Sequence, residues 1–85
     1  MKMDEYSMYA VYDVKAEVYD IPFFSRSDLM AKRKFIIDCE QRDNTVLANF
    51  KDDFELHKLG TFKPNTGEFF NISPIVVIGG KEIKK

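Results

Sequence analysis

The sequence has too few cysteines to form a disulfide or a thiolate metal site. Cys39 is the only cysteine among the 85 residues, so no disulfide can form within the chain. A zinc site made of thiolates and a redox Cys-x-x-Cys pair are excluded for the same reason. We therefore expect no metal and no cofactor, and a reducing cytoplasm as the setting.

Long apolar runs and an excess of positive charge are also absent. The longest apolar stretch, residues 75–78, is far too short to cross a membrane, and no apolar run follows the N-terminal residues 1–5. We expect a soluble protein that is not exported and has no membrane partner. The formal charge of -1, from 13 basic and 14 acidic side chains, argues against a uniformly basic coat for nucleic acid. Any cationic surface must be a local patch.

The residues that are present indicate a folded chain. Hydrophobic residues make up 45% of the sequence, with eight Phe and four Tyr but no Trp, so the core should depend on aromatic rings. A chain of this length has room for one domain, residues 1–85, and we expect residues 79–85 to form a flexible C-terminal tail.

The first half of the chain predicts two strands and a helix. Side chains alternate over residues 6–12 and again over 16–19, which predicts an antiparallel hairpin with a loop built around a type I turn. Pro22 keeps the following segment extended. A helix should begin at an N-cap of Ser25 or Ser27 and run through Arg42. Its inward stripe is Ala31, Phe35 and Cys39, flanked by Ile36, whereas Met30 and Ile37 lie on another side.

The second half predicts three more strands. Residues 45–53 are ambiguous, and we interpret them as a loop with one helical turn that tucks Val46, Leu47 and Phe50 inward. Alternation over residues 54–59, the turn Lys63-Pro64-Asn65-Thr66-Gly67 and the run 68–72 predict a second hairpin. The β-branched run 75–78 suits a buried or edge strand. The fold class is therefore α+β, with a small antiparallel sheet of about four to five strands packed against one main helix.

A search for catalytic residues gives no active site. His57 has no Cys or Ser at motif spacing, and we interpret it as a structural residue facing solvent. Asp52 and Asp53 form a solvated turn rather than a metal site, and Cys39 is a core residue. The glycines form no phosphate-binding loop. We predict that the protein is not an enzyme.

Cations close to aromatic residues are the feature that suggests binding of nucleic acid. Cations can neutralise phosphates while rings stack on bases without regard to sequence, which is what single-strand binding requires. The alternative is that the Lys-Arg-Lys run is a solvated helix face and that the phenylalanines belong to the core. The candidate DNA-binding residues are Arg26, Lys32, Arg33, Lys34, Tyr9, Tyr12, Phe23 and Phe24.

An ordered set of short motifs resembles the small nonstructural protein of gokushoviruses, which are microviruses with single-stranded circular DNA. The motifs are Tyr9-Ala10-Val11-Tyr12-Asp13, Pro22-Phe23-Phe24, the helical Ala31, Arg33 and Phe35, Asp53-Phe54-Glu55-Leu56, Leu59-Gly60-Thr61-Phe62 and Asn65-Thr66-Gly67. The chain departs from the family pattern at residues 50–53 and 63–64, and no resemblance is found beyond Gly67. The resemblance implies a bacteriophage protein that binds DNA during viral DNA replication or packaging in the host cell cytoplasm.

Two functions from different classes follow. The first is a non-enzymatic accessory protein that binds single-stranded DNA. The second is an adaptor that docks on phage replication or capsid proteins, the replication initiator or the procapsid, through Met30, Ile37 and residues 75–78. A homodimer would let one small patch contact a strand twice.

Overall fold

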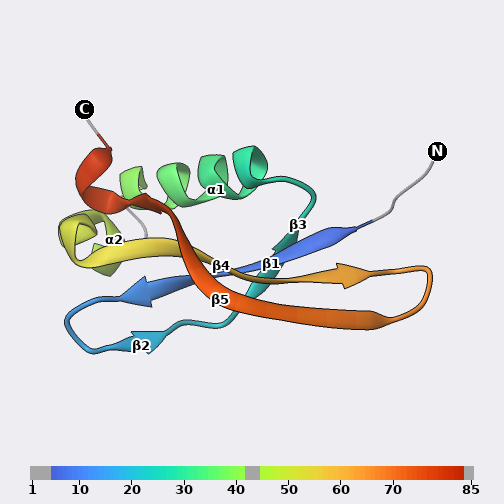
Figure 1. Cartoon of the computed structure of the whole chain (residues 1–85). Helices are drawn as coiled ribbons and strands as arrows, with labels where there is room; N and C mark the ends of the chain where they lie inside the picture. The colour runs from blue at the N-terminus through green and yellow to red at the C-terminus, as the bar shows by residue number, and fades with distance from the viewer. Residues whose placement is uncertain (1–4, 42–44, 84–85) are drawn as a thin grey trace.

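The chain folds into a five-stranded antiparallel sheet with one main helix on it, which confirms the predicted α+β class (Figure 1). The computed structural model describes residues 5–41 and 45–83. The elements in chain order are β1 (Tyr6–Asp13), β2 (Val18–Tyr19), β3 (Phe23–Ser25), α1 (Asp28–Glu40), α2 (Thr45–Asn49), η1 (Lys51–Asp53), β4 (Phe54–Lys63), β5 (Glu68–Gly79) and η2 (Gly80–Glu82). In the part of the chain that is described, no helix has the length and hydrophobicity needed to span a membrane.

The sheet is built around β1 and β4, which pair from Tyr6↔Phe62 to Asp13↔Phe54. The strand order is β2-β1-β4-β5, and β3 also pairs with β1. Since β4 occupies one edge of β1, β2 and β3 must share the other edge as a single interrupted strand. Pro22 lies in the interruption, where its missing N–H breaks no ladder. The strand β5 forms the opposite edge of the sheet.

The helix α1 begins at Ser27, whose hydroxyl accepts a hydrogen bond from the Met30 backbone N–H at 3.2 Å. Of the two predicted N-caps, the structure therefore uses Ser27. The helix ends at Glu40, before the predicted end at Arg42, which lies outside the described residues. Its buried residues are Ala31, Phe35 and Cys39, as the four-residue spacing predicted.

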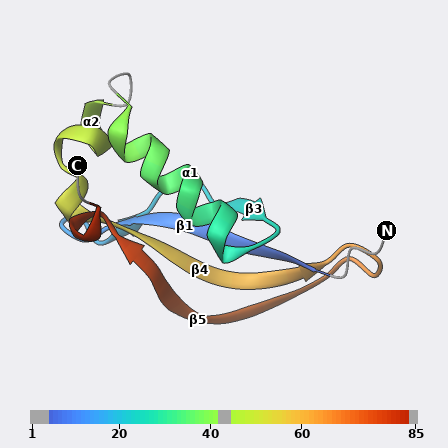
Figure 2. The same ribbon diagram turned by 90° about the horizontal axis from the view of Figure 1, so that it is seen from above.

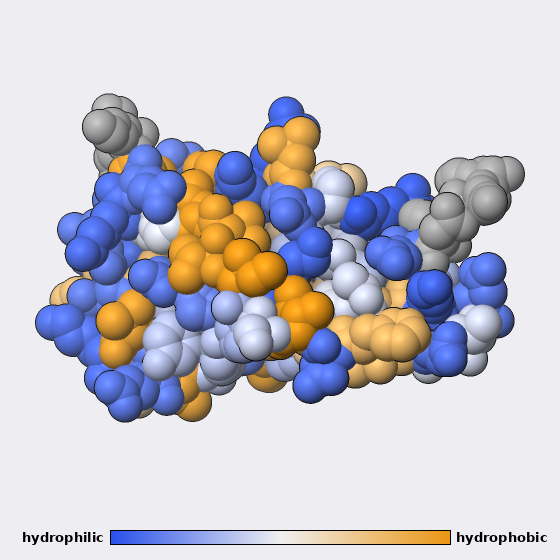
Figure 3. Space-filling view, in the orientation of Figure 1, coloured by the Kyte–Doolittle hydropathy of each residue, from blue (hydrophilic) through white to orange (hydrophobic). Residues whose placement is uncertain are grey.

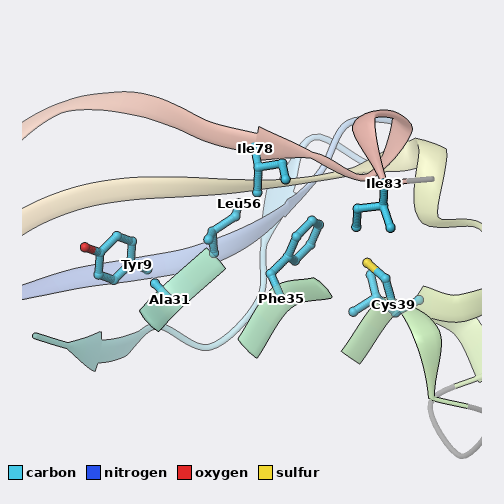
Figure 4. Packing of buried hydrophobic residues seen from close by; sticks show 8 residues of the cluster. Tyr9, Ala31, Phe35, Cys39, Leu56, Ile78 and Ile83 are labelled. Atoms are coloured by element: carbon cyan, nitrogen blue, oxygen red, sulfur yellow. The ribbon is translucent and has the colours of Figure 1, made fainter. Parts of the chain in front are cut away.

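The hydrophobic core lies between this helical stripe and one face of the sheet. Figure 4 shows Tyr9, Leu56 and Ile78 facing the helix across the core. Ile83 is also buried and closes the end of the core near Cys39. Part of the segment expected to form a flexible tail thus supplies a core residue, because burying this apolar side chain is favourable.

A bulge in β4 changes which residues face the helix. Tyr9 pairs with Lys58 and Met8 pairs with Gly60, so Leu59 is an extra residue in the ladder. A slip of one residue moves every later side chain to the opposite face. As a result Leu56 faces the helix, whereas Phe62 lies on the other face of the sheet, with His57.

The segment after α1 differs in detail from the prediction. The predicted helical turn exists as α2 (Thr45–Asn49), and Leu47 is buried as expected. Val46 and Phe50 are exposed, so the prediction that they tuck inward is wrong. A helix of five residues presents one side to the core, and Leu47 occupies it. Further along, the two strands expected on either side of Pro74 form one edge strand, β5, which tolerates the missing N–H through an irregular register.

The two hairpin loops share one backbone design. In the β1–β2 loop the Glu17 N–H donates to the Asp13 carbonyl at 2.7 Å, and in the β4–β5 loop the Gly67 N–H donates to the Lys63 carbonyl at 2.8 Å. The last loop residue is left-handed in both, with φ of 59° at Glu17 and 77° at Gly67. Only the second loop has glycine at the position that favours it.

Exchanging the residue type at these two positions should therefore change stability in opposite directions. We expect Gly67→Ala to lower the free energy of unfolding by about 1 kcal/mol, because a Cβ is strained in the left-handed region. Glu17→Gly should raise it by a few tenths of a kcal/mol, since relief of that strain exceeds the entropy cost of glycine. Urea unfolding of both variants measures this, and shifts of the same sign would contradict it.

Candidate nucleic-acid interface

One face of the sheet is left uncovered. The helix α1 lies over one face, and no described helix lies over the opposite one, as the two perpendicular views show (Figure 1, Figure 2). We call the uncovered side the open face. The strand registers place two groups of aromatic side chains on it, which we call the phenylalanine cluster (Phe24, Phe62 and Phe69) and the tyrosine–histidine cluster (Tyr12, Tyr19 and His57).

The phenylalanine cluster joins three strands at one end of the sheet. The rings of Phe24 in β3 and Phe62 in β4 lie 5.8 Å apart between centroids, and Phe62 is the cross-strand partner of Phe69 in β5. Phe24 is 53% exposed and Phe69 is 45% exposed. These two rings therefore lose contact with water only if something else covers them.

Gly60 makes room for the Phe69 ring. A Cβ at position 60 would lie 2.9 Å from Cζ of Phe69 and 2.5 Å from the Phe70 carbonyl oxygen, closer than atoms can pack. Without a side chain at Gly60, the Phe69 ring can approach the β4 backbone closely. A strand glycine at this place thus positions an aromatic ring on the open face.

The tyrosine–histidine cluster is held by a chain of hydrogen bonds. Tyr19 Oη lies 2.8 Å from Nδ1 of His57, and Nε2 of His57 lies 2.8 Å from Oε1 of Glu55. The Tyr12 ring stacks on the imidazole at 4.9 Å between centroids. The chain connects β2 to β4 across β1 and explains why His57 is buried, contrary to the expectation that it faces solvent.

The electrostatics of this cluster favour a structural role. Desolvation by burial raises the pKa of Tyr19, and the neighbouring Tyr12 and Glu55 raise it further. The phenol is therefore protonated at neutral pH and can donate to the imidazole. A tyrosine nucleophile would need the opposite shift. Within the described residues no group of three or more His, Cys, Asp or Glu side chains could hold a metal.

Tyr9, one of the predicted stacking residues, lies on the helix side of the sheet. Its side chain has no exposed surface, and its hydroxyl donates to Oδ1 of Asp28 at 2.5 Å. The Lys58 amine lies 3.4 Å from the same carboxylate oxygen. Burial and this hydrogen bond raise the pKa of Tyr9 to about 12, while the hydrogen bond from Tyr9 lowers the pKa of Asp28. Tyr9 is therefore a core residue whose ring is not accessible to the bases of DNA. The prediction that its ring stacks on DNA bases is wrong.

Phe23 and Lys34 also belong to the helix side. The Phe23 ring stacks against Tyr9 at 5.9 Å and is partly buried against the core. The Lys34 amine lies 4.9 Å from the centre of the Phe23 ring and 2.9 Å from Oδ2 of Asp38. This cation is therefore engaged by an aromatic ring and an acidic neighbour, and only its remaining exposed surface could meet a phosphate.

The predicted cations divide between the two sides of the molecule. Lys32 and Arg33 lie on α1, and the positive charge of Lys32 contributes to lowering the pKa of Asp28. Arg26 follows β3 at the end of the sheet where the phenylalanine cluster lies, and Lys63 follows Phe62 at the same end. Neither Arg26 nor Lys63 forms an ion pair with another residue of the described ranges, and the Lys63 amine lies 5.8 Å from the centre of the Phe70 ring.

The structure thus brings together part of the predicted set. Tyr12 and Phe24 share the open face, with Arg26 at its end, whereas Tyr9, Phe23 and the helix cations occupy the other side. Residues on the open face or at its end that the sequence did not single out are Tyr19, Phe62, Lys63 and Phe69. The alternation of β4 could not identify Phe62, because the bulge at Leu59 reverses its direction.

Replacing Tyr9 by Phe tests its assignment to the core. We expect Tyr9→Phe to lower stability by about 1 kcal/mol at neutral pH through loss of the hydrogen bond to Asp28. The wild type should also lose stability as the pH rises from about 10 to about 12, because the Tyr9 pKa is raised in the folded state, and the variant should lack this loss. Urea unfolding as a function of pH measures both effects. An equal loss of stability between about pH 10 and about pH 12 in the wild type and in Tyr9→Phe would contradict the assignment.

Protonation of the Asp28 carboxylate should likewise lower the stability of the protein at acid pH. Its pKa is lowered in the folded state, so its stabilising contribution is present at neutral pH and is lost as the pH falls through the carboxyl range below about 4. In Tyr9→Phe this loss should be smaller, since the hydrogen bond from Tyr9 is the largest cause of the shift.

Comparison of the sequence with known proteins identifies the family to which the chain belongs. A family model described as Phage ORF5 protein matches residues 6–83, and this match continues past Gly67, where the motif resemblance ended. Neither the curated proteins nor the solved structures contain a match to the chain. Because the matched region covers nearly the whole chain and the whole sheet with its helices, the chain belongs to the Phage ORF5 protein family, and it is a phage protein.

Proposed function

We propose that this phage protein binds single-stranded DNA on the open face of its sheet. The role would be that of a non-enzymatic accessory protein in replication or packaging of a gokushovirus-type genome, in the host cell cytoplasm. The observation that carries the proposal is the pair of aromatic clusters on a sheet face that no described helix covers.

Exposed rings on an antiparallel sheet are suited to unpaired bases. Every base has an aromatic face that can stack on Phe or Tyr, so binding needs no particular sequence. Sheet modules that bind single-stranded nucleic acid use this arrangement, with rings on neighbouring strands receiving successive bases. Phe24 and Phe69 have the exposure this requires, and Tyr19 adds a partly exposed ring at the other cluster.

The two clusters are far enough apart to contact different nucleotides. On β1, Met8 pairs with Phe24 and Tyr12 pairs with Tyr19. Four residues along a strand correspond to about 13 Å, which exceeds the width of one base. A single strand would therefore run along β1 from one cluster to the other.

Phosphate contacts on this side would come from the end of the sheet. The strand registers place no lysine or arginine among the open-face positions, so the candidate cations are Arg26, which follows β3, and Lys63, whose amine lies 5.8 Å from the centre of the Phe70 ring. Two cations neutralise few phosphates, and binding should depend mostly on stacking.

Removing the rings tests the stacking surface. We expect Phe24→Leu and Phe69→Leu each to weaken binding of an oligothymidylate by about fivefold or more, because stacking contributes about 1–3 kcal/mol per base. Leucine keeps the apolar contact with Phe62 or Gly60 but has no aromatic face. Fluorescence anisotropy with a labelled oligonucleotide at low salt measures the change.

Phe50 provides a matched control for these variants. It is 58% exposed, about as much as Phe24, but lies between α2 and η1 and not in a strand of the sheet. Phe50→Leu should leave the affinity unchanged. An equal loss of affinity in all three variants, or no loss in Phe24→Leu and Phe69→Leu, would rule out the open face as the binding surface.

The dependence on salt distinguishes the two sides of the molecule. If Arg26 and Lys63 supply the phosphate contacts, the affinity should fall by only about sevenfold between 50 and 200 mM salt. If DNA instead contacts the four predicted cations Arg26, Lys32, Arg33 and Lys34, the fall should be about fiftyfold. Arg33→Gln should leave the slope unchanged, and Lys63→Gln should make it shallower. The reverse result would place the DNA on the helix side.

A second function is favoured by apolar side chains that remain exposed away from the open face. Met30 and Ile37 on α1 and Ile75 on β5 are each more than half exposed, and apolar surface gathers on the side of the molecule where β5 runs (Figure 3). Such surface suits an adaptor that docks on the replication initiator or the procapsid, or a homodimer. Complexes with phage proteins that survive nuclease treatment would support the adaptor function.

A further inference from the structure

A groove lies on the helix side of the sheet and shares only the edge residue Tyr19 with the two aromatic clusters of the open face. It has a volume of about 400 Å³ and runs between the β2–β3 edge, α1 and α2. Its inner wall is apolar and includes Val11, Phe23, Leu47 and Phe54, all at least partly buried against the core. The proposed DNA function uses none of this inner wall.

The rims of the groove carry apolar side chains that the fold itself does not bury. Ile21, between β2 and β3, is 83% exposed, and Val18 and Val46 are each more than half exposed. Ile21 and Val18 belong to the sheet edge and Val46 to α2, so the exposed side chains face the same groove from different elements. Apolar rims around a concave site are typical of a surface that is covered by a partner.

The charges in the groove determine the chemistry of that partner. Asp13, Asp20 and Asp38 line it together with one cation, Lys34, which is already paired with Asp38 at 2.9 Å. Asp13 and Asp20 each use Oδ1 to accept backbone N–H groups, at Lys15 and Ala16 and at Ile21 respectively. No hydrogen bond to a residue of the described ranges uses the Oδ2 of either one. The groove therefore repels phosphate and favours a cationic group.

We infer that this groove binds a short apolar segment of a partner protein that carries lysine or arginine. Apolar side chains of the segment would fill the space between Ile21 and Val46, and its cation would pair with Asp13 or Asp20. Charge complementarity selects this occupant over nucleic acid, and the phenylalanine cluster of the open face remains free in the complex. The protein could thus hold a strand of DNA on one side and a basic partner on the other.

The test uses the full chain labelled with nitrogen-15 and a capped hexapeptide of alternating leucine and arginine. We expect the peptide to shift the amide resonances of residues 18–23 and 46–47 in a saturable manner at up to millimolar concentration. The leucine–glutamate counterpart of the same length should cause no such shifts. Asp20→Asn, which retains an oxygen for the Ile21 N–H, should weaken binding by about two- to fivefold.

Matched variants and rival occupants complete the test. Glu68→Gln removes the same charge at the far hairpin and should leave peptide binding unchanged, whereas Val46→Ser should weaken it.

Absence of saturable shifts, equal binding of the glutamate peptide, or shifts outside the groove would overturn the inference. Groove shifts that arise from concentrating the protein alone would identify a second copy as the occupant, and oligothymidylate shifts at residues 46–47, which belong to the groove and not to the open face, would identify DNA. Failure of DNA binding on the open face leaves these outcomes unchanged.

Discussion

The packing of α1 on one face of the sheet is the interaction on which the rest of the structure depends. Ala31, Phe35 and Cys39 bury a single stripe, and Tyr9 and Leu56 complete the contact from the sheet. A helix of 13 residues is about 20 Å long, whereas the strands β4 and β5, of 10 and 12 residues, extend over more than about 30 Å. The helix therefore covers only part of one face, and the other face receives no helix from the described chain.

The phenylalanine cluster on the uncovered face depends on two local features. The bulge at Leu59 turns Phe62 to the side opposite Leu56, and Gly60 next to it lets the Phe69 ring approach the strand. Without the bulge Phe62 would project toward the helix side, where α1 leaves the end of the sheet uncovered. Leu59 and Gly60 thus separate two parts of β4. The part before them, with Leu56, packs against the helix, and the part after them, with Phe62, belongs to the phenylalanine cluster.

Local patterns in the sequence predicted much of the fold. The spacing of Ala31, Phe35 and Cys39 gave the buried side of the helix, and Pro64 with Gly67 gave the second hairpin, because each depends on neighbours along the chain. Which of the candidate site residues share one face could not be predicted in this way, because it depends on contacts between distant residues. Nothing near Tyr9 in sequence indicates that its hydroxyl meets Asp28, 19 positions away.

Proximity in sequence was also a poor guide to which cations and rings share a surface. Lys32, Arg33 and Lys34 follow Phe24 closely along the chain, but the sheet separates α1 from the open face. Lys63 is far from Phe24 in sequence and lies at the same end of the sheet, because β4 returns beside β1. Pairing of β1 with β4 is a long-range contact that strand alternation does not specify.

The central claim is that unpaired DNA stacks on the open face of the sheet. Mapping an oligothymidylate onto the nitrogen-15-labelled chain by amide chemical shifts tests it most directly. If DNA stacks on the open face, the amide resonances of Phe24, Phe62, Phe69 and Tyr19 should shift in a saturable manner, and those of α1 should not. Shifts confined to α1, or none at low salt, would contradict it.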